Sequence, residues 1–225
     1  MDDESSDEAV LEFLSAIHPV SRETIDRLKT YRALLGEWQA KTNLVAPGTL
    51  EHFWRRHVGD SLQALAIFPK VQSWMDLGSG AGFPGMVIAI ANAEYHERSH
   101  VLVESNQKKC AFLRTVARET GASVTVENAR IESVAQRFAA TPPEVVTARA
   151  LAPLAKLIEL AEPLLAAGAL GLFHKGRDFG RELEDCRGLW RFDLVKHESR
   201  IEAGSALLEI GNPVRVGPER VAGRA

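Results

Sequence analysis

A run of glycines behind an acidic residue is the part of this sequence best suited to chemistry. Residues 74–85 read Trp-Met-Asp-Leu-Gly-Ser-Gly-Ala-Gly-Phe-Pro-Gly, and an apolar run follows at 86–93. The pattern predicts a buried strand, a glycine-rich turn and a buried helix. Glycine allows positive φ and close approach of a ligand to the main chain, and proline suits the first turn of a helix. This order of elements indicates a nucleotide-cofactor loop and favours an enzyme.

The acidic residue bears on which nucleotide the loop binds. Gly80-x-Gly82-x-x-Gly85 matches the dinucleotide fingerprint, but the glycines begin earlier, as Asp76-x-Gly78-x-Gly80. A dinucleotide loop turns helix N–H groups toward a pyrophosphate, which the Asp76 carboxylate would oppose. Asp76 suits a cofactor with a positive centre and an amino group, such as S-adenosylmethionine. The alternative is a glycine-rich turn without a ligand.

A second carboxylate follows the next predicted strand. Glu104 comes directly after Val101-Leu102-Val103. At this position a carboxylate accepts hydrogen bonds from the ribose hydroxyls of an adenosine. The alternative is an N-cap for the helix that starts near Asn106, a role for which Ser105 is the better candidate.

Three further loops follow strands at the same edge of the predicted sheet. The loop that contains Ile131 and Glu132 could read an adenine ring through its amides or be a plain connection. Arg149 could orient a cofactor carboxylate or an RNA phosphate, or form a surface ion pair. Lys175 and Arg177 follow the fifth strand, where Lys175 could meet phosphate or be solvated.

Several kinds of catalytic group are missing. The polar-Pro-Pro-aromatic motif of amine methyltransferases is absent from the end of the fourth strand, and Thr141-Pro142-Pro143-Glu144 precedes that strand. Cys110 and Cys186 both fall in predicted helices, which disfavours the thiolate chemistry of pyrimidine C5 methylation. The seven histidines lack zinc-site spacing, so we expect no metal.

The elements that must position these residues fall into two parts. We expect a disordered acidic tail at 1–7, a helical cap at 8–70, an α/β domain at 71–216 and a flexible tail at 217–225. In the cap, the predicted helices are 8–17, 22–40 (with Ser21 as N-cap) and 49–68.

From residue 73 the sequence alternates between strand and helix patterns. The predicted strands are 73–77, 100–104, 123–126, 145–148, 169–173, 192–197 and 206–210. The predicted helices between them are 85–93, 106–120, 131–139, 153–166 and 179–189. This alternation predicts a doubly wound α/β fold with a mostly parallel seven-stranded sheet, helices on both faces and a C-terminal antiparallel hairpin.

Composition is that of a globular domain, and charge is unevenly distributed. The 225 residues are 45% hydrophobic and carry a net charge of −3. Six acids lie within residues 1–12, and the remainder holds 27 bases against 24 acids. We expect a basic rim for RNA, with a solvated mixed-charge surface as the alternative. Its candidate residues are Arg55, Arg56, Arg149, Lys175 and Arg177.

The same sequence bears on location. No apolar run is long enough to cross a membrane, and the acidic start lacks the pattern of a signal peptide. We therefore expect a cytoplasmic protein without membrane contact.

Together these residues resemble the bacterial small-subunit ribosomal RNA guanine-N7 methyltransferase family, also called glucose-inhibited division protein B. The resemblance covers about residues 30–211. It is carried by Arg56-His57-Val58-Gly59-Asp60-Ser61, the loop at 76–85, Glu104-Ser105 with Lys108-Lys109-x-x-Phe112-Leu113, Arg130-Ile131-Glu132, Ala148-Arg149-Ala150 and Lys175-Gly176. Glu104 stands where many relatives carry Asp, and Phe83 where many carry Leu.

The resemblance implies a class I S-adenosylmethionine-dependent methyltransferase fold and transfer of a methyl group to N7 of one guanosine in 16S ribosomal RNA. The substrate would be that RNA or the small ribosomal subunit, and the enzyme a monomer. By family analogy, the cofactor contacts are Gly78, Phe83, Ile131, Glu132 and Arg149. Guanine N7 has a free lone pair and no proton to lose, so no catalytic base is expected. The rival interpretations are an NAD-dependent oxidoreductase and a non-catalytic RNA-binding protein.

Overall fold

The computed structural model describes residues 6–46 and 48–216. Most of the predicted acidic tail, and all of the predicted tail at 217–225, lie outside these ranges. Helix α1 (Asp7–Ser15) begins earlier than predicted, because the Ser6 side chain accepts a hydrogen bond from the amide of Ala9 and caps the helix. Asp7 therefore belongs to a helix and not to a disordered tail.

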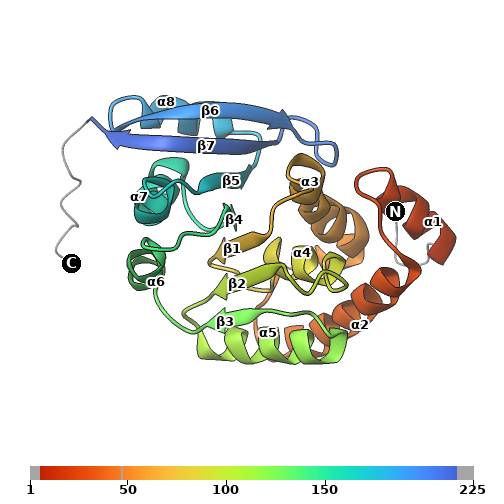
Figure 1. Cartoon of the computed structure of the whole chain (residues 1–225). Helices are drawn as coiled ribbons and strands as arrows, with labels where there is room; N and C mark the ends of the chain where they lie inside the picture. The colour runs from red at the N-terminus through yellow and green to blue at the C-terminus, as the bar shows by residue number, and fades with distance from the viewer. Residues whose placement is uncertain (1–5, 47, 217–225) are drawn as a thin grey trace.

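A single sheet forms the centre of the described structure, with the strand order β3-β2-β1-β4-β5-β7-β6 (Figure 1). The strands are β1 (Ser73–Leu77), β2 (Ser99–Val103), β3 (Thr125–Glu127), β4 (Val145–Arg149), β5 (Leu170–Lys175), β6 (Trp190–Glu198) and β7 (Ala206–Arg215). The first five strands are parallel, whereas β7 is antiparallel to both β5 and β6. The predicted topology is confirmed. The order in which the strands are added changes direction between the parallel strands β1 and β4, and α/β folds bind ligands at such a point.

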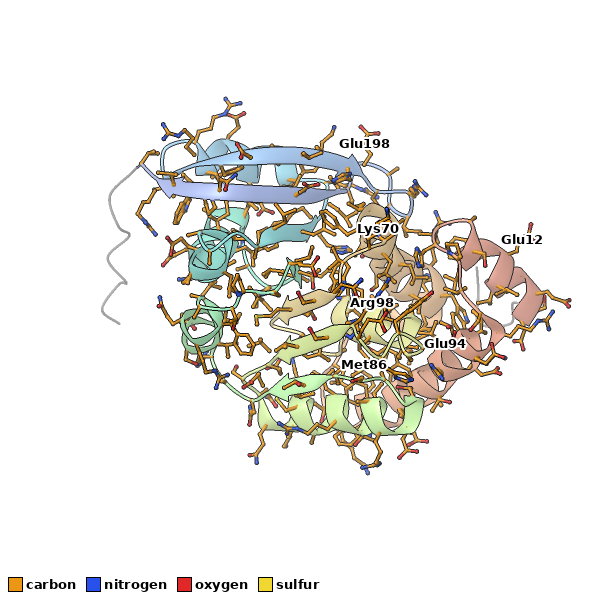
Figure 2. The ribbon with its side chains drawn as sticks, in the orientation of Figure 1. Glu12, Lys70, Met86, Glu94, Arg98 and Glu198 are labelled. Carbon is orange, nitrogen blue, oxygen red and sulfur yellow. The ribbon has the colours of Figure 1, made fainter. Side chains whose placement is uncertain are left out.

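Both faces of the sheet are covered by helices, as its sequence pattern predicts. Trp74 and Leu102 belong to the core shared with α2 (Arg22–Gln39), α4 (Gly85–Ala91) and α5 (Gln107–Thr120). Met75 and Leu77 point the other way, because side chains alternate along a strand. They pack in the core of α6 (Ile131–Phe138), α7 (Leu154–Leu165) and α8 (Phe179–Cys186). Figure 2 shows Met86 inside the molecule, while Glu12 and Glu198 project outward.

The cap departs from prediction between residues 49 and 68. The prediction of a single helix is wrong, because the segment divides into a 3-10 turn (Leu50–His52), a π-helical segment (Phe53–Gly59) and α3 (Asp60–Ile67). Over so few residues, apolar spacing does not distinguish these forms. The division leaves Arg55 and Arg56 exposed and buries His57.

The cap packs directly on the glycine loop. Tyr31 of α2 is fully buried, its hydroxyl donates a hydrogen bond to the carbonyl of Ala81, and its ring stacks on Phe83 with centroids 5.3 Å apart. Phe83 in turn stacks on His57 at 4.5 Å. The predicted boundary near residue 70 therefore marks a change of secondary structure within one shared hydrophobic core.

Among the helices of residues 6–46 and 48–216, none combines the length and the hydropathy that a membrane span needs.

Candidate active site

A cavity of about 610 Å³ lies at the carboxyl ends of the parallel strands, a size usual for small-molecule sites. Its walls are formed by the loops after β1, β2, β3 and β4 and by the cap loop at 44–46. Of the predicted cofactor residues, those that line it are Gly78, Gly80, Phe83, Glu104, Ile131, Glu132 and Arg149. Asp76 and Gly82 do not line it.

The glycines of the loop have different roles. Gly80 has a φ of +57°, its amide donates to Glu104 Oε2 over 3.0 Å, and only a backbone oxygen 3.7 Å away would meet a Cβ there. Gly82 has a φ of +101°, and a Cβ there would lie 2.7 Å from the Tyr31 hydroxyl and 2.7 Å from Met86 Cβ. Gly80 therefore faces the cavity, whereas the prediction for Gly82 is corrected, because Gly82 lets the cap approach the loop closely.

Glu104 joins two of the cavity walls. It is 8% exposed, and its two oxygens accept from the amides of Gly80 and of Asn106, the latter over 2.7 Å. The N-cap of α5 is Asn106 and not Ser105, since the Asn106 side chain accepts from the amide of Lys108 over 2.9 Å. A carboxylate has about four acceptor positions, so Glu104 retains the capacity to accept from a ligand.

Asp76 lies beneath the loop and not in the cavity. It is 2% exposed, and its Oδ1 accepts from the Thr147 hydroxyl over 2.8 Å. Its Oδ2 has no hydrogen-bond partner in the described chain and faces the start of α4, where a Cβ on Gly85 would come within 2.9 Å. Burial raises the pKa of Asp76 to about 6. The prediction that Asp76 contacts the cofactor is thus corrected, because the pleat turns its side chain away.

The cap loop that closes the cavity was missed by sequence reasoning. Gln39, the last residue of α2, holds this loop from one side: its Oε1 accepts from the amides of Leu44 and Val45, over 3.0 and 3.1 Å, and its Nε2 donates to the Val45 carbonyl over 2.9 Å. The residues of this loop form no motif in the sequence, and nothing in them indicates the strand ends that the loop faces.

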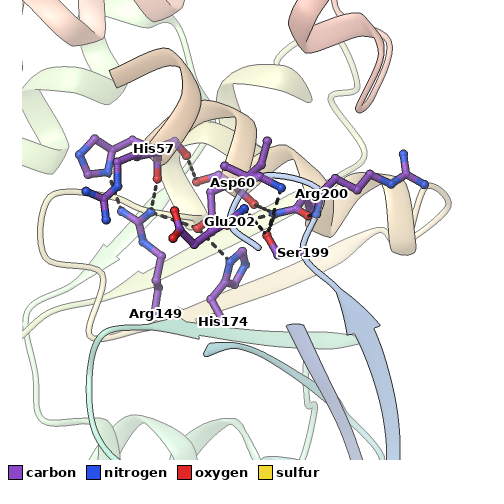
Figure 3. A network of polar contacts seen from close by, with 11 residues as sticks. His57, Asp60, Arg149, His174, Ser199, Arg200 and Glu202 are labelled. Carbon is purple, nitrogen blue, oxygen red and sulfur yellow. Dashed lines mark hydrogen bonds and ion pairs between the residues drawn. The ribbon is translucent and has the colours of Figure 1, made fainter. Parts of the chain in front are cut away.

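Arg149 connects the sheet to the cap (Figure 3). Its Nη1 donates to the carbonyl of Arg56 over 2.8 Å and to Asp60 Oδ2 over 3.2 Å, and its Nη2 lies 2.9 Å from His57 Nδ1. The guanidinium carbon also sits 5.0 Å from the centre of the Phe83 ring. Arg149 therefore forms an ion pair with Asp60, and the pair is largely buried and not at the surface. The contact of Arg149 with a cofactor stays a prediction.

The charges around this arginine are fixed by their surroundings. Burial opposes ionisation of Asp60, but His174 and Arg149 prevail and lower its pKa to about 2. Burial, followed by the Arg149 charge, lowers the pKa of His57 to about 3. At neutral pH the network thus contains an anionic Asp60, a cationic Arg149 and a neutral His57, which accepts at Nδ1 from the guanidinium.

The predicted basic rim is only partly present. The Lys175 side chain is 7% exposed, and its ammonium lies 2.6 Å from Glu182 Oε2 and donates to the Ala152 carbonyl over 2.8 Å. The prediction that Lys175 contacts RNA phosphate is corrected, because its charge is buried and paired. Arg56 is exposed, as is Arg177, which pairs with Glu202. The remaining arginine of the rim, Arg55, donates to the carbonyl of Ile201 over 3.0 Å.

Comparisons with known proteins identify relatives of this chain. A family model described as GidB, rRNA small subunit methyltransferase G, matches residues 24–206. A Ribosomal RNA small subunit methyltransferase G from Chelativorans sp. is 47% identical over 194 residues, 86% of this chain and 91% of the relative. One from Methylorubrum extorquens is 48% identical over 204 residues, 89% of this chain and 94% of the relative.

Solved structures agree on the fold. That of an O-methyltransferase from Bacillus cereus in complex with SAH is 14% identical to this chain, with a TM-score of 0.55 over 91% of this chain and 97% of that one. At this identity the likeness concerns the fold alone. Within the described residues, no group of three or more side chains is placed to hold a metal ion.

The buried Asp76 generates a prediction about stability. Its folded pKa of about 6 exceeds the ordinary 3.8, so the folded state binds the proton more tightly. The free energy of unfolding of the wild type should therefore fall relative to Asp76→Asn as pH rises from about 4 to about 6, by about 3 kcal/mol, and then level off. Urea denaturation of both proteins across this range measures the difference. Asp26→Asn, at an exposed side chain, is the control. A difference that does not vary with pH would contradict the burial argument.

Proposed function

The chain belongs to the rRNA small subunit methyltransferase G family, and we propose that it transfers a methyl group from S-adenosylmethionine to N7 of a guanosine in 16S ribosomal RNA. The observation that carries the proposal is the cavity at the strand ends, where the glycine loop and the Glu104 carboxylate face the same space. The substrate is ribosomal RNA, free or in the small subunit, and the enzyme acts in the cytoplasm.

The residues of the cavity fit S-adenosylmethionine. Glu104 supplies the acidic acceptor that ribose hydroxyls require, and the start of α6 at Ile131 and Glu132 supplies backbone amides for an adenine ring. Gly80 leaves its backbone accessible for the methionine part, and Gly78, against which Leu151 packs, lines the same cavity. When bound, the cofactor supplies an electrophilic methyl group on a sulfonium.

Methyl transfer to guanine N7 requires alignment of the two reactants and no proton transfer. The lone pair on guanine N7 forms the new nitrogen–carbon bond, and the electron pair of the broken carbon–sulfur bond stays on sulfur. No proton moves, so the task of this chain is to hold both reactants in line. The walls do this from four loops, and Gln39 and Arg149 fix the cap over them.

The proposal is tested by the product. The purified protein is incubated with methyl-labelled S-adenosylmethionine and unmethylated small-subunit RNA, both free and in small subunits. Digestion and mass analysis should give N7-methylguanosine at one site. Label at another atom or base, or none with either substrate, would contradict the proposal.

Glu104 should affect cofactor binding directly. Glu104→Gln removes the negative charge that faces the ribose, so calorimetry should show at least a tenfold loss of affinity for S-adenosylhomocysteine, about 1.4 kcal/mol. Stability should also fall, because a carboxamide has one acceptor oxygen for the two amides that Glu104 now accepts from.

The matched control is Glu127→Gln, at the end of the adjacent strand β3. Glu127 pairs with Arg137 and does not line the cavity. Unchanged affinity in Glu104→Gln, once the fraction of folded protein is accounted for, would make Glu104 a structural residue only.

The exposed arginines should carry part of the RNA affinity. Arg56→Gln with Arg177→Gln removes two cations near the β6–β7 turn, so the slope of log affinity against log salt should flatten by about 1 to 2. Binding of S-adenosylhomocysteine should remain intact. Arg118→Gln with Arg187→Gln is the matched control, since both side chains are exposed and also pair with a glutamate. Equal slopes in the two double variants would place the RNA surface elsewhere.

A further inference from the structure

Positive side chains gather at the mouth of the cavity where the neighbouring strands β2 and β3 end. Lys109 and Arg130 line the cavity, and Lys108 is the exposed neighbour of Lys109. The side chain of Asn128, in the loop after β3, donates to two backbone carbonyls just before α5, over 3.2 and 3.0 Å, and so holds the two segments together. Residues 108, 109 and 130 therefore form one group, the β2–β3 cluster.

The charges of the β2–β3 cluster are not compensated within residues 6–46 and 48–216. In these ranges none of its three side chains forms an ion pair or a hydrogen bond. Other cations that line the cavity are paired: Lys156 lies 3.1 Å from Glu159, and Arg149 lies 3.2 Å from Asp60. The cluster is thus the part of the cavity wall that leaves positive charge open to a ligand.

Two of these cations stand at an unfavourable place in their helix. Lys108 and Lys109 belong to the first turn of α5, which contains no acidic residue. The N-terminal end of a helix carries partial positive charge, so cations there are destabilising. Helix α6, which starts at the same edge, instead has Glu132 in its first turn. A local conflict without a compensating contact in the fold is expected at functional sites, and here it calls for negative charge from outside the chain.

The cofactor does not supply this negative charge. The sulfonium and the ammonium group of S-adenosylmethionine outweigh its single carboxylate, so the bound cofactor adds positive charge to the cavity. Glu104 and Glu132, the acidic residues of the cavity wall, suit such a ligand. The β2–β3 cluster opposes it, because like charges repel each other across a cavity. The cluster therefore fits a second, anionic ligand.

We propose that the β2–β3 cluster is a contact surface for the RNA backbone, on which Lys108, Lys109 and Arg130 meet phosphates. The assignment rests on the proposed function, in which a guanosine must reach the methyl group at this edge of the sheet. Contacts to phosphate position a nucleic acid without reading its sequence. Arg56 and Arg177 lie toward the β6–β7 turn, so the RNA is held on both sides of the cavity.

The salt dependence of RNA binding tests the cluster. The full chain is titrated with protein-free small-subunit RNA at several salt concentrations, with S-adenosylhomocysteine present. Lys108→Gln with Arg130→Gln removes two phosphate contacts, so the slope of log affinity against log salt should flatten by about 1 to 2. Lys109→Gln removes one contact and should flatten the slope by about 0.7.

The matched control removes one lysine and one arginine elsewhere, as Lys70→Gln with Arg118→Gln. Lys70 is exposed and precedes β1, at the other end of the strands. Arg118 is exposed in the last turn of α5, where it pairs with the neighbouring Glu119. This variant should keep the wild-type slope. A slope for Lys108→Gln with Arg130→Gln that equals the slope of the control would overturn the proposal.

A second measurement distinguishes RNA from the carboxylate of the cofactor as the partner of the cluster. Because the cluster holds RNA, calorimetry should give Lys109→Gln, and also Lys108→Gln with Arg130→Gln, an affinity for S-adenosylhomocysteine within threefold of the wild type. A larger loss would assign the cations to the cofactor carboxylate and would also overturn the proposal.

Thermal unfolding separates RNA contact from a role in folding. Lys108→Gln removes a cation from the positive end of α5, so its midpoint of unfolding should equal or exceed that of the wild type. A lower midpoint would assign Lys108 to the fold and not to RNA. A wild-type protein that does not bind small-subunit RNA at any salt concentration would instead refute the proposed function, so the two failures are distinguishable.

Discussion

The contact of Phe83 with the helical cap fixes one wall of the cavity at the strand ends. Phe83 lies between Tyr31 and His57 in a continuous stack, and Arg149 covers it from the sheet side. Aromatic stacking and dispersion hold the glycine loop from above, while the Tyr31 hydroxyl satisfies the Ala81 carbonyl that the turn leaves unpaired. This contact holds the loop from the side of the cap, while the hydrogen bond from the Gly80 amide to Glu104 holds it to the end of β2.

Electrostatics adds a second constraint at the same place. Arg149 and Asp60 are both largely buried, so each would be costly without the other. Their pairing also sets the states of two histidines: His57 accepts from Arg149, and His174 donates to Asp60. One ion pair thus fixes the orientation of both rings. This is a physical reason for an arginine to stand at the end of β4 even where its guanidinium does not contact a ligand.

The buried position of Asp76 removes a charge-based reason against a dinucleotide. From the sequence, the charge of Asp76 opposed a pyrophosphate. In the structure Asp76 is turned beneath the loop, and its high pKa leaves it partly protonated near pH 6, so its charge says little about the ligand. What distinguishes this chain is its family membership and the β6–β7 hairpin that closes the sheet, together with a cap that covers the cofactor loop.

The sequence by itself determined the order of strands and helices, the antiparallel end of the sheet and the four strand-end loops that line the cavity. These follow from local patterns: apolar runs, glycine turns and the rule that parallel strands end at one edge. Only the tertiary structure decided which way the side chains in those loops face. Asp76, Gly82 and Lys175 stand at the predicted positions but serve packing and pairing, because the pleat and the neighbouring elements direct them inward. The network of His57, Asp60 and His174 was equally hidden, since its members come from segments more than a hundred residues apart.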